Sequence, residues 1–156
     1  MSSRLQEEIK QNKPFHTIEE EAYLNIVRTE DKLAQPQHAL FKSAGITGSQ
    51  YNVLRILRGA GEAGLTCGQI AERMLTRDPD VTRLLDRLEQ RGLASRGRDS
   101  DDRRVVVNRV TEEGLSLLAR LDAPLAEIHV RQLGHLGKER LRQLVSLLEL
   151  ARERVS

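Results

Sequence analysis

Residues 78–96 read DPDVTRLLDRLEQRGLASR, an apolar pattern with helical spacing between a start signal and a stop signal. Asp78 is a favoured capping residue and Pro79 is tolerated in the first turn of a helix, while Gly92 favours helix termination. Four apolar residues between these signals define one face: Val81, Leu84, Leu85 and Leu88. We therefore expect one amphipathic helix that buries this face.

The opposite face of the predicted helix is polar and basic. Its residues are Thr82, Arg83, Asp86 and Arg87. A DNA major groove about 12 Å wide admits one helix, where Arg reaches guanine O6 and N7 and Thr reaches a base methyl group or a phosphate. We therefore expect Thr82, Arg83 and Arg87 to contact DNA. The alternative for Arg87 is a local ion pair with Asp86 or Glu89.

After this helix, the apolar spacing changes from helical to extended. Residues 93–96 and 105–110 are predicted to be strands, joined by the charged link GRDSDDRR at 97–104. This pattern is typical of a hairpin, whose tip would place Arg103 and Arg104 farther along the duplex. A narrow minor groove has an enhanced negative potential that accepts an inserted Arg. The arginines expected to contact phosphates are Arg77, Arg98 and Arg103.

The excess of positive charge lies in the same part of the chain. The formal net charge is +2 over 156 residues. Residues 66–110 hold ten basic and eight acidic side chains, and the two signs balance on either side of this segment. All ten basic residues are Arg, which binds phosphates and guanine edges through paired hydrogen bonds. The charge composition alone fits an ordinary surface of mixed charge. The position of the excess positive charge, beside the predicted helix and hairpin, favours DNA binding.

Capping signals upstream predict three more helices. TIEE at 17–20 predicts a helix through about residue 35, which Pro36 ends, and the polar residues 1–16 before it are expected to be irregular. TGSQ at 47–50 predicts a helix to about residue 58, and TCGQ at 66–69 predicts a short one. Further expectations are a connector containing Leu40 and Phe41, and an inward face of Ile70, Ala71 and Met74 on the short helix.

Two longer helices are predicted after the hairpin. The first follows Thr111 and contains Pro124, which is expected to bend or interrupt it. Its apolar face is Leu115, Leu118, Leu121, Leu125 and Ile128. The second covers about residues 138–155, with a stripe of Leu141, Leu144, Val145, Leu148 and Ala151. This stripe is too apolar to stand alone, so we expect a symmetric dimer that covers it and holds two groove-binding helices about one DNA turn apart.

The order of elements predicts a mainly α fold: a winged helix-turn-helix with a small β wing, flanked by N- and C-terminal dimerisation helices. We assign residues 36–110 to the DNA-binding winged helix and residues 1–35 and 111–156 to dimerisation, within one compact chain. The expected assembly is a homodimer on a pseudo-palindromic operator in double-stranded DNA.

Composition and motifs argue against other classes. The chain is 31% charged, has no apolar run long enough for a transmembrane helix, and lacks the apolar core of a secretory signal, so a cytoplasmic protein is expected. No nucleophile motif, Gly-rich phosphate loop or His spacing typical of metal ligands is present, so we expect no enzyme, metal or cofactor. The one cysteine, Cys67, is expected to be a buried structural residue.

Residues 78–96, DPDVTRLLDRLEQRGLASR, followed by DSDDRRVVVNRVTEEG at 99–114, resemble the MarR (multiple antibiotic resistance regulator) family. The resemblance implies a homodimeric winged-helix repressor or activator. By position, it implies that Thr82 and Arg83 contact DNA from the recognition helix. It also implies that Arg104 enters the minor groove and that Asp102 orients the wing by pairing with a nearby Arg.

The chain departs from the family pattern at two places. Val110 stands where Leu is usual, which is a small change in the core. Asp78 and Asp80 stand where many members have Ser, Gln or small residues, and Asp80 near the major groove would accept from cytosine N4 or weaken binding.

Relatives bind small aromatic anions between the dimer helices and the DNA-binding helices. Tyr23, Phe41 and Tyr51 flank this region, and ordinary core packing is the alternative for each.

Two other functions remain open from the sequence. A winged helix that binds only proteins would have no DNA role, and its arginines would be spread over the surface rather than confined to one helix face and the wing. A constitutive DNA binder would need no effector. An effector-controlled regulator would instead respond to a small aromatic or anionic molecule by a shift between dimer conformations.

Overall fold

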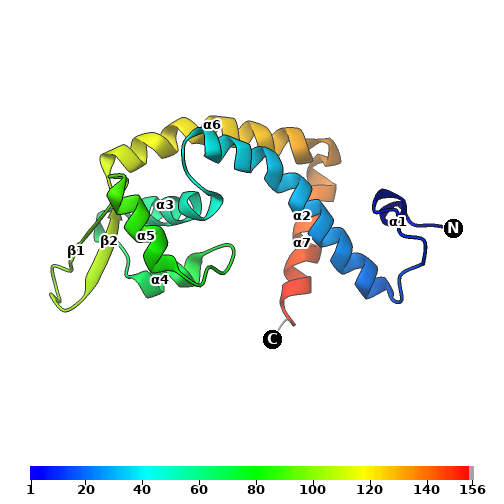
Figure 1. The fold of residues 1–156 in the computed structure, drawn as a ribbon, viewed down its shortest axis with the longest axis horizontal. Coiled ribbons are helices and arrows are strands. Elements are labelled where there is room, and N and C mark those ends of the chain that lie inside the picture. The colour runs from blue at the N-terminus through cyan, green and yellow to red at the C-terminus, as the bar shows by residue number, and fades with distance from the viewer. Residues whose placement is uncertain (155–156) are drawn as a thin grey trace. The chain divides into compact units, whose positions relative to one another are not determined.

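The computed structural model describes residues 1–154, which divide into two compact units at Pro36 (Figure 1). The first unit contains α1 (Arg4–Glu8) and most of α2 (Ile18–Ser43). The second begins at Gln37 and contains the end of α2 and everything that follows. None of the helices within residues 1–154 is both long enough and apolar enough to cross a membrane.

The second unit has the predicted order of helices and strands. Its elements are α3 (Gly48–Ala60), η1 (Gly61–Ala63), α4 (Cys67–Arg73), α5 (Val81–Gln90), β1 (Ala94–Arg98), β2 (Val106–Val110), α6 (Glu112–Leu133), η2 (Gly134–Leu136) and α7 (Gly137–Arg152). Helices α3, α4 and α5 lie together beside the hairpin β1–β2 (Figure 1). The mainly α fold with a winged helix-turn-helix is therefore confirmed.

The wing is a two-stranded antiparallel sheet, with Ala94 opposite Val110 and Arg98 opposite Val106. It is joined to the helices by an isolated bridge between Leu65 and Asn108, whose backbone groups exchange hydrogen bonds of 3.0 and 2.7 Å. The strands begin one residue later than predicted. The difference arises because sheet pairing, rather than side-chain composition, fixes where a strand starts.

A shared core holds α3, α4, α5 and α6 together. Its fully buried side chains are Val53, Leu54, Leu57, Ile70, Leu88 and Leu118. The N-terminus of α6 also approaches β1 closely, since a Cβ on Gly114 would lie 2.3 Å from the carbonyl oxygen of Leu93. Burial of apolar surface at about 25 cal/mol per Å² therefore stabilises the winged helix and α6 as one body.

Capping residues begin most of these helices as predicted. Thr47 with Gln50, and Thr66 with Gln69, form reciprocal capping boxes at α3 and α4. Thr111 accepts from the Gly114 backbone at the start of α6.

At the N-terminus, two details differ from the predictions. The stretch 1–16 is not wholly irregular, because Ser3 and Gln6 form a capping box that begins α1. Thr17 caps α2 by accepting from the Glu20 backbone at 3.1 Å, but the Glu20 carboxylate accepts from His16, one residue before the cap.

The prediction that Pro36 ends the second helix is wrong. Helix α2 continues to Ser43, so Leu40 and Phe41 lie in its last turns rather than in a connector. Proline costs a helix one backbone hydrogen bond. Here the additional turns bury Phe41 in the core against Tyr51, which offsets that cost. Helix α6 likewise continues through Pro124 without interruption.

Several predicted apolar faces also differ from the structure. Ala71 is exposed, and on α6 the residue Leu117 is buried while Leu115 is 41% exposed. Helix α7 buries none of its residues fully: of its predicted stripe, Leu141 and Leu148 are half-buried, and Leu144, Val145 and Ala151 are exposed. Val155, the predicted end of that helix, lies outside the described residues.

Candidate nucleic-acid interface

Helix α5 begins two residues later than the sequence suggested. Its cap is Asp80, whose Oδ1 accepts a hydrogen bond of 3.0 Å from the Arg83 backbone N–H. Asp78 lies in the preceding turn and accepts from the Asp80 N–H at 2.8 Å. The carboxylate of Asp80 therefore caps α5, a role that the sequence pattern had assigned to Asp78.

The outward face of α5 carries the predicted contact residues. Thr82, Arg83 and Arg87 are exposed, whereas Val81, Leu85 and Leu88 are buried against the rest of the winged helix. Arg77 in the turn before α5 is exposed as well. A helix whose apolar face is fully engaged can turn only its polar face to a partner.

An arginine that the sequence analysis did not select ties α5 to the wing. The guanidinium of Arg96, on β1, pairs with Asp86, and its backbone N–H donates to Glu89 at 3.1 Å. The hydrogen bond with Asp86 raises the pKa of Arg96. Among the described residues Arg87 forms no ion pair with Asp86 or Glu89, whose carboxylates lie against Arg96 instead. No spacing rule on one helix could have found this pair, since it joins a helix to a strand.

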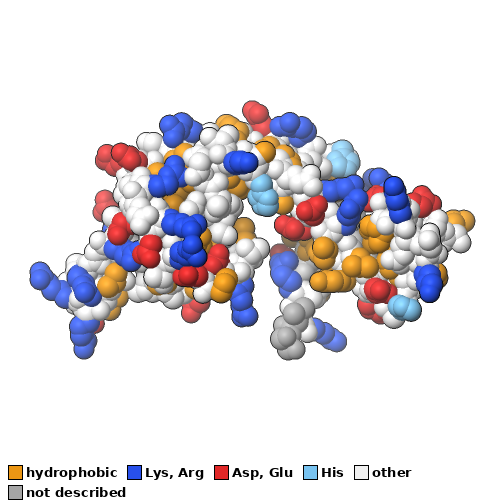
Figure 2. Space-filling view, in the orientation of Figure 1, with side chains coloured by type: hydrophobic (Ala, Val, Ile, Leu, Met, Phe, Trp, Pro, Cys, Tyr) orange, Lys and Arg blue, Asp and Glu red, His pale blue; other side chains and the backbone are white. Residues whose placement is uncertain are grey.

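At the wing tip, hydrogen bonds to Asp102 fix the side chain of Arg104. Asp102 accepts from Arg104 Nε and Nη2, each at 3.1 Å, and from the Arg104 backbone at 3.0 Å. These bonds, from the side chain and then the backbone, hold the pKa of the Asp102 carboxyl below its usual range. The Arg104 side chain is still 91% exposed. Basic side chains gather at the wing end of the molecule in Figure 2, where Arg98 and Arg103 are also exposed.

Cys67 packs against the core but is only partly buried, where full burial was expected. It is partly exposed at the first position of α4, and its Sγ lies 3.4 Å from the hydroxyl of Thr82 on α5. The contact places the thiol against the face of α5 that carries the candidate DNA contacts.

The three candidate ligand-binding aromatics have different surroundings. Phe41 and Tyr51 stack with ring centroids 4.4 Å apart, and Phe41 is buried. Burial raises the pKa of the Tyr51 hydroxyl, and Asp122 adds to that effect while Arg58 opposes it. Tyr23 belongs to the first unit and is 65% exposed.

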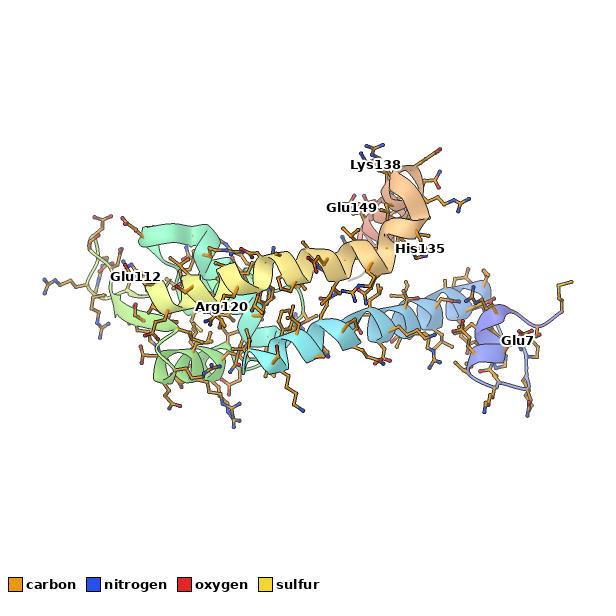
Figure 3. The ribbon with its side chains drawn as sticks, turned by 90° about the horizontal axis from the view of Figure 1, so that it is seen from above. Glu7, Glu112, Arg120, His135, Lys138 and Glu149 are labelled. Carbon is orange, nitrogen blue, oxygen red and sulfur yellow. The ribbon has the colours of Figure 1, made fainter. Side chains whose placement is uncertain are left out.

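A polar pocket of about 490 Å³ lies at the start of α6. Its walls include Arg91, Leu93, Glu112 and Arg120, of which Glu112 and Arg120 project from α6 in Figure 3. His135, also labelled there, lies in η2. Within residues 1–154, no three side chains of the metal-binding types come together.

Comparisons with known proteins agree with this geometry. A model described as "MarR family" matches residues 44–105, from the end of α2 to the wing. FarR of Neisseria gonorrhoeae, an HTH-type transcriptional regulator, is 30% identical over 130 residues, which are 83% of this chain and 88% of FarR. The crystal structure of a MarR transcription factor from Planctomyces limnophilus has 42% identity and a TM-score of 0.66, covering 87% of this chain and 98% of that one. The chain belongs to the MarR family.

Three further similar proteins extend the comparison. The transcriptional repressor MdtR of Bacillus subtilis (strain 168) is 36% identical over 99 residues, which are 64% of this chain and 63% of MdtR, less than two thirds of its length. A mutant of S. aureus MepR, bound to an oligodeoxyribonucleotide, is 26% identical with a TM-score of 0.57 over 83% of this chain and 94% of that one. NadR in complex with 4-hydroxyphenylacetate is 26% identical with a TM-score of 0.72 over 91% of this chain and all of that one.

Membership in the MarR family confirms the resemblance seen in the sequence. It also confirms the predicted class, a transcriptional regulator with a winged helix-turn-helix rather than an enzyme.

The cap of α5 gives a testable prediction. Asp80→Ala removes the acceptor for the Arg83 N–H and is expected to lower the free energy of unfolding by about 1 kcal/mol, measured by urea denaturation. Asp80→Asn is the matched control, since Asn keeps the acceptor, and its stability should stay near that of the unmodified protein. If Asp78→Ala destabilised the protein and Asp80→Ala did not, the helix would begin at Asp78 instead.

Proposed function

We propose that the chain is a homodimeric repressor that binds a pseudo-palindromic operator in double-stranded DNA and acts in the cytoplasm. The observation that carries the proposal is the pairing of two exposed basic features, the outer face of α5 and the wing tip at Arg104. A mutant of S. aureus MepR, which shares the fold, is bound to an oligodeoxyribonucleotide in its solved structure. Residues 36–110 form the DNA-binding part in this proposal.

The proposal assigns a kind of DNA contact to each arginine and to Thr82. Thr82 and Arg83 read bases from the N-terminal half of α5, where a recognition helix approaches the major groove. Arg87 reads bases or contacts phosphate one turn later. Arg104 enters the minor groove, and Asp102 fixes its direction before DNA arrives. The residues assigned to phosphates are Arg77, Arg98 and Arg103.

Exposed apolar side chains support the homodimer. On α7, Leu144, Val145, Leu147 and Leu150 are 36–65% exposed. In the first unit, Ile18, Tyr23, Ile26 and Val27 are 46–71% exposed. Exposed apolar surface of this extent is unfavourable in water. In a symmetric homodimer, a second copy of the chain covers it. Residues 1–35 and 111–156 therefore form the dimerisation part.

An effector that releases DNA completes the proposed mechanism. NadR was crystallised with 4-hydroxyphenylacetate, a small aromatic anion. We propose a ligand of this class beside Phe41 and Tyr51 of the second unit, while Tyr23, in the first unit, stays a prediction from the sequence. Such a ligand acts by binding more tightly to a dimer whose recognition helices are wrongly spaced for the operator.

Arg104→Ala tests the wing. We expect the Kd for operator DNA to rise about tenfold, because one favourable DNA contact is worth about 1–3 kcal/mol, and the measurement is a gel-shift titration. Arg120→Ala is the matched control, since it removes the same charge from an exposed position on α6. Equal affinities of the two variants would refute the wing assignment.

A binding constant of the unmodified protein that does not change with salt would favour the protein-interaction alternative.

The dimer has its own test. Lysine at both Leu147 and Leu150 is expected to produce monomers in sedimentation velocity, because charges at exposed apolar positions disrupt an interface without disturbing the protomer. The operator affinity should fall with the loss of the dimer. Leu75→Lys, a similar change at an exposed apolar position outside residues 1–35 and 111–156, should leave the dimer intact. A double variant that stayed dimeric would contradict the proposed role of α7.

A further inference from the structure

The turn between α4 and α5 is held to the core by Met74, which packs against it, and by a hydrogen bond to a buried amide. This turn covers residues 74–80 and is the green loop that joins the two helices in Figure 1. Asn52, in the middle of α3, accepts a hydrogen bond of 2.8 Å at its Oδ1 from the backbone N–H of Leu75. The side chain of Leu75 is 78% exposed, so apolar burial of that side chain does not hold the turn.

Asn52 is an unfavourable residue for its own position. It is 6% exposed and is followed by the fully buried Val53 and Leu54. Its Nδ2 is buried and has no hydrogen-bond partner among the described residues. A buried donor without a partner lowers stability, and an apolar side chain of similar size would avoid that loss. The advantage of Asn52 must therefore lie in what its oxygen does for the turn.

The bond to Leu75 is the first of a series that leads to the recognition helix. Asp78 next accepts from the Asp80 N–H, and Asp80 accepts from the Arg83 N–H. Each bond restricts the chain a few residues nearer to Thr82 and Arg83. The three bonds lie in order along the chain, from the attachment of Leu75 to α3 to the end of α5 that faces DNA in the proposed function.

We infer that Asn52 is a positioning residue for operator recognition. It touches no base or phosphate. Its carboxamide oxygen fixes the turn before α5, and this fixes the direction in which Thr82 and Arg83 approach the base edges. The inference rests on the proposed function, because it assigns to Asn52 the discrimination between operator and unrelated DNA. Contacts that read bases depend on exact placement, whereas attraction to phosphates does not.

Two substitutions separate positioning from stability. Asn52→Leu removes the unpartnered donor, which raises stability, and the acceptor of the Leu75 N–H, which lowers it, so the midpoint of thermal unfolding should change little. The ratio of operator affinity to affinity for an unrelated duplex should nevertheless fall about tenfold, the size of one lost base contact. Asn52→Asp keeps an oxygen acceptor but buries a charge, so the midpoint should fall while the affinity ratio stays within about threefold of the unmodified protein.

The measurements are competition gel shifts with the full chain, operator DNA obtained by selection from random duplexes, and a scrambled duplex of equal length. Amide hydrogen exchange at Leu75 provides an independent signal and should become faster in Asn52→Leu. An unchanged affinity ratio in Asn52→Leu, or a ratio that follows the unfolding midpoint in both variants, would overturn the inference. If the unmodified protein selected no DNA, the proposed function itself would fail.

Discussion

Burial of one face of α5 is the constraint on which the proposed interface depends. Val81, Leu85 and Leu88 pack against the winged-helix core, so the basic face is directed outward by the loss of apolar surface to water rather than by any attraction to DNA. The pair between Arg96 and Asp86 then fixes the wing relative to that helix. Helix and wing consequently form one preorganised surface, which reduces the entropy lost when a partner binds.

The acids near this surface explain how a chain of low net charge can present a basic face. Asp80 caps α5, Asp86 binds Arg96, and Asp102 holds Arg104. Each carboxylate thus bonds to a neighbouring group of the protein instead of standing free toward a phosphate. Arg83 and Arg87, in contrast, have exposed side chains with no ion pair among the described residues. The total charge of +2 therefore says little about the interface, and the arrangement of the pairs says more.

The sequence predicted the parts of the fold that local chemistry determines. Capping boxes at Thr47 and Thr66 and the apolar face of α5 correctly gave helices and their order. Local rules failed where tertiary packing decided the outcome, as when burial of Phe41 carried α2 through Pro36. They also failed for contacts between distant segments. Arg96 on β1 pairs with Asp86 on α5, and Asn52 bonds to Leu75, 23 residues farther along the chain. No periodic pattern within one element marks either residue.

The central claim is that two copies of this surface read opposite halves of one DNA site. Selection of bound duplexes from random DNA, followed by footprinting, tests it most directly. The account predicts enrichment of an inverted repeat with half-site centres about 10 base pairs apart, protected in the major groove at each half-site. Enrichment of a single unrepeated site, or no enrichment over the starting pool, would contradict it.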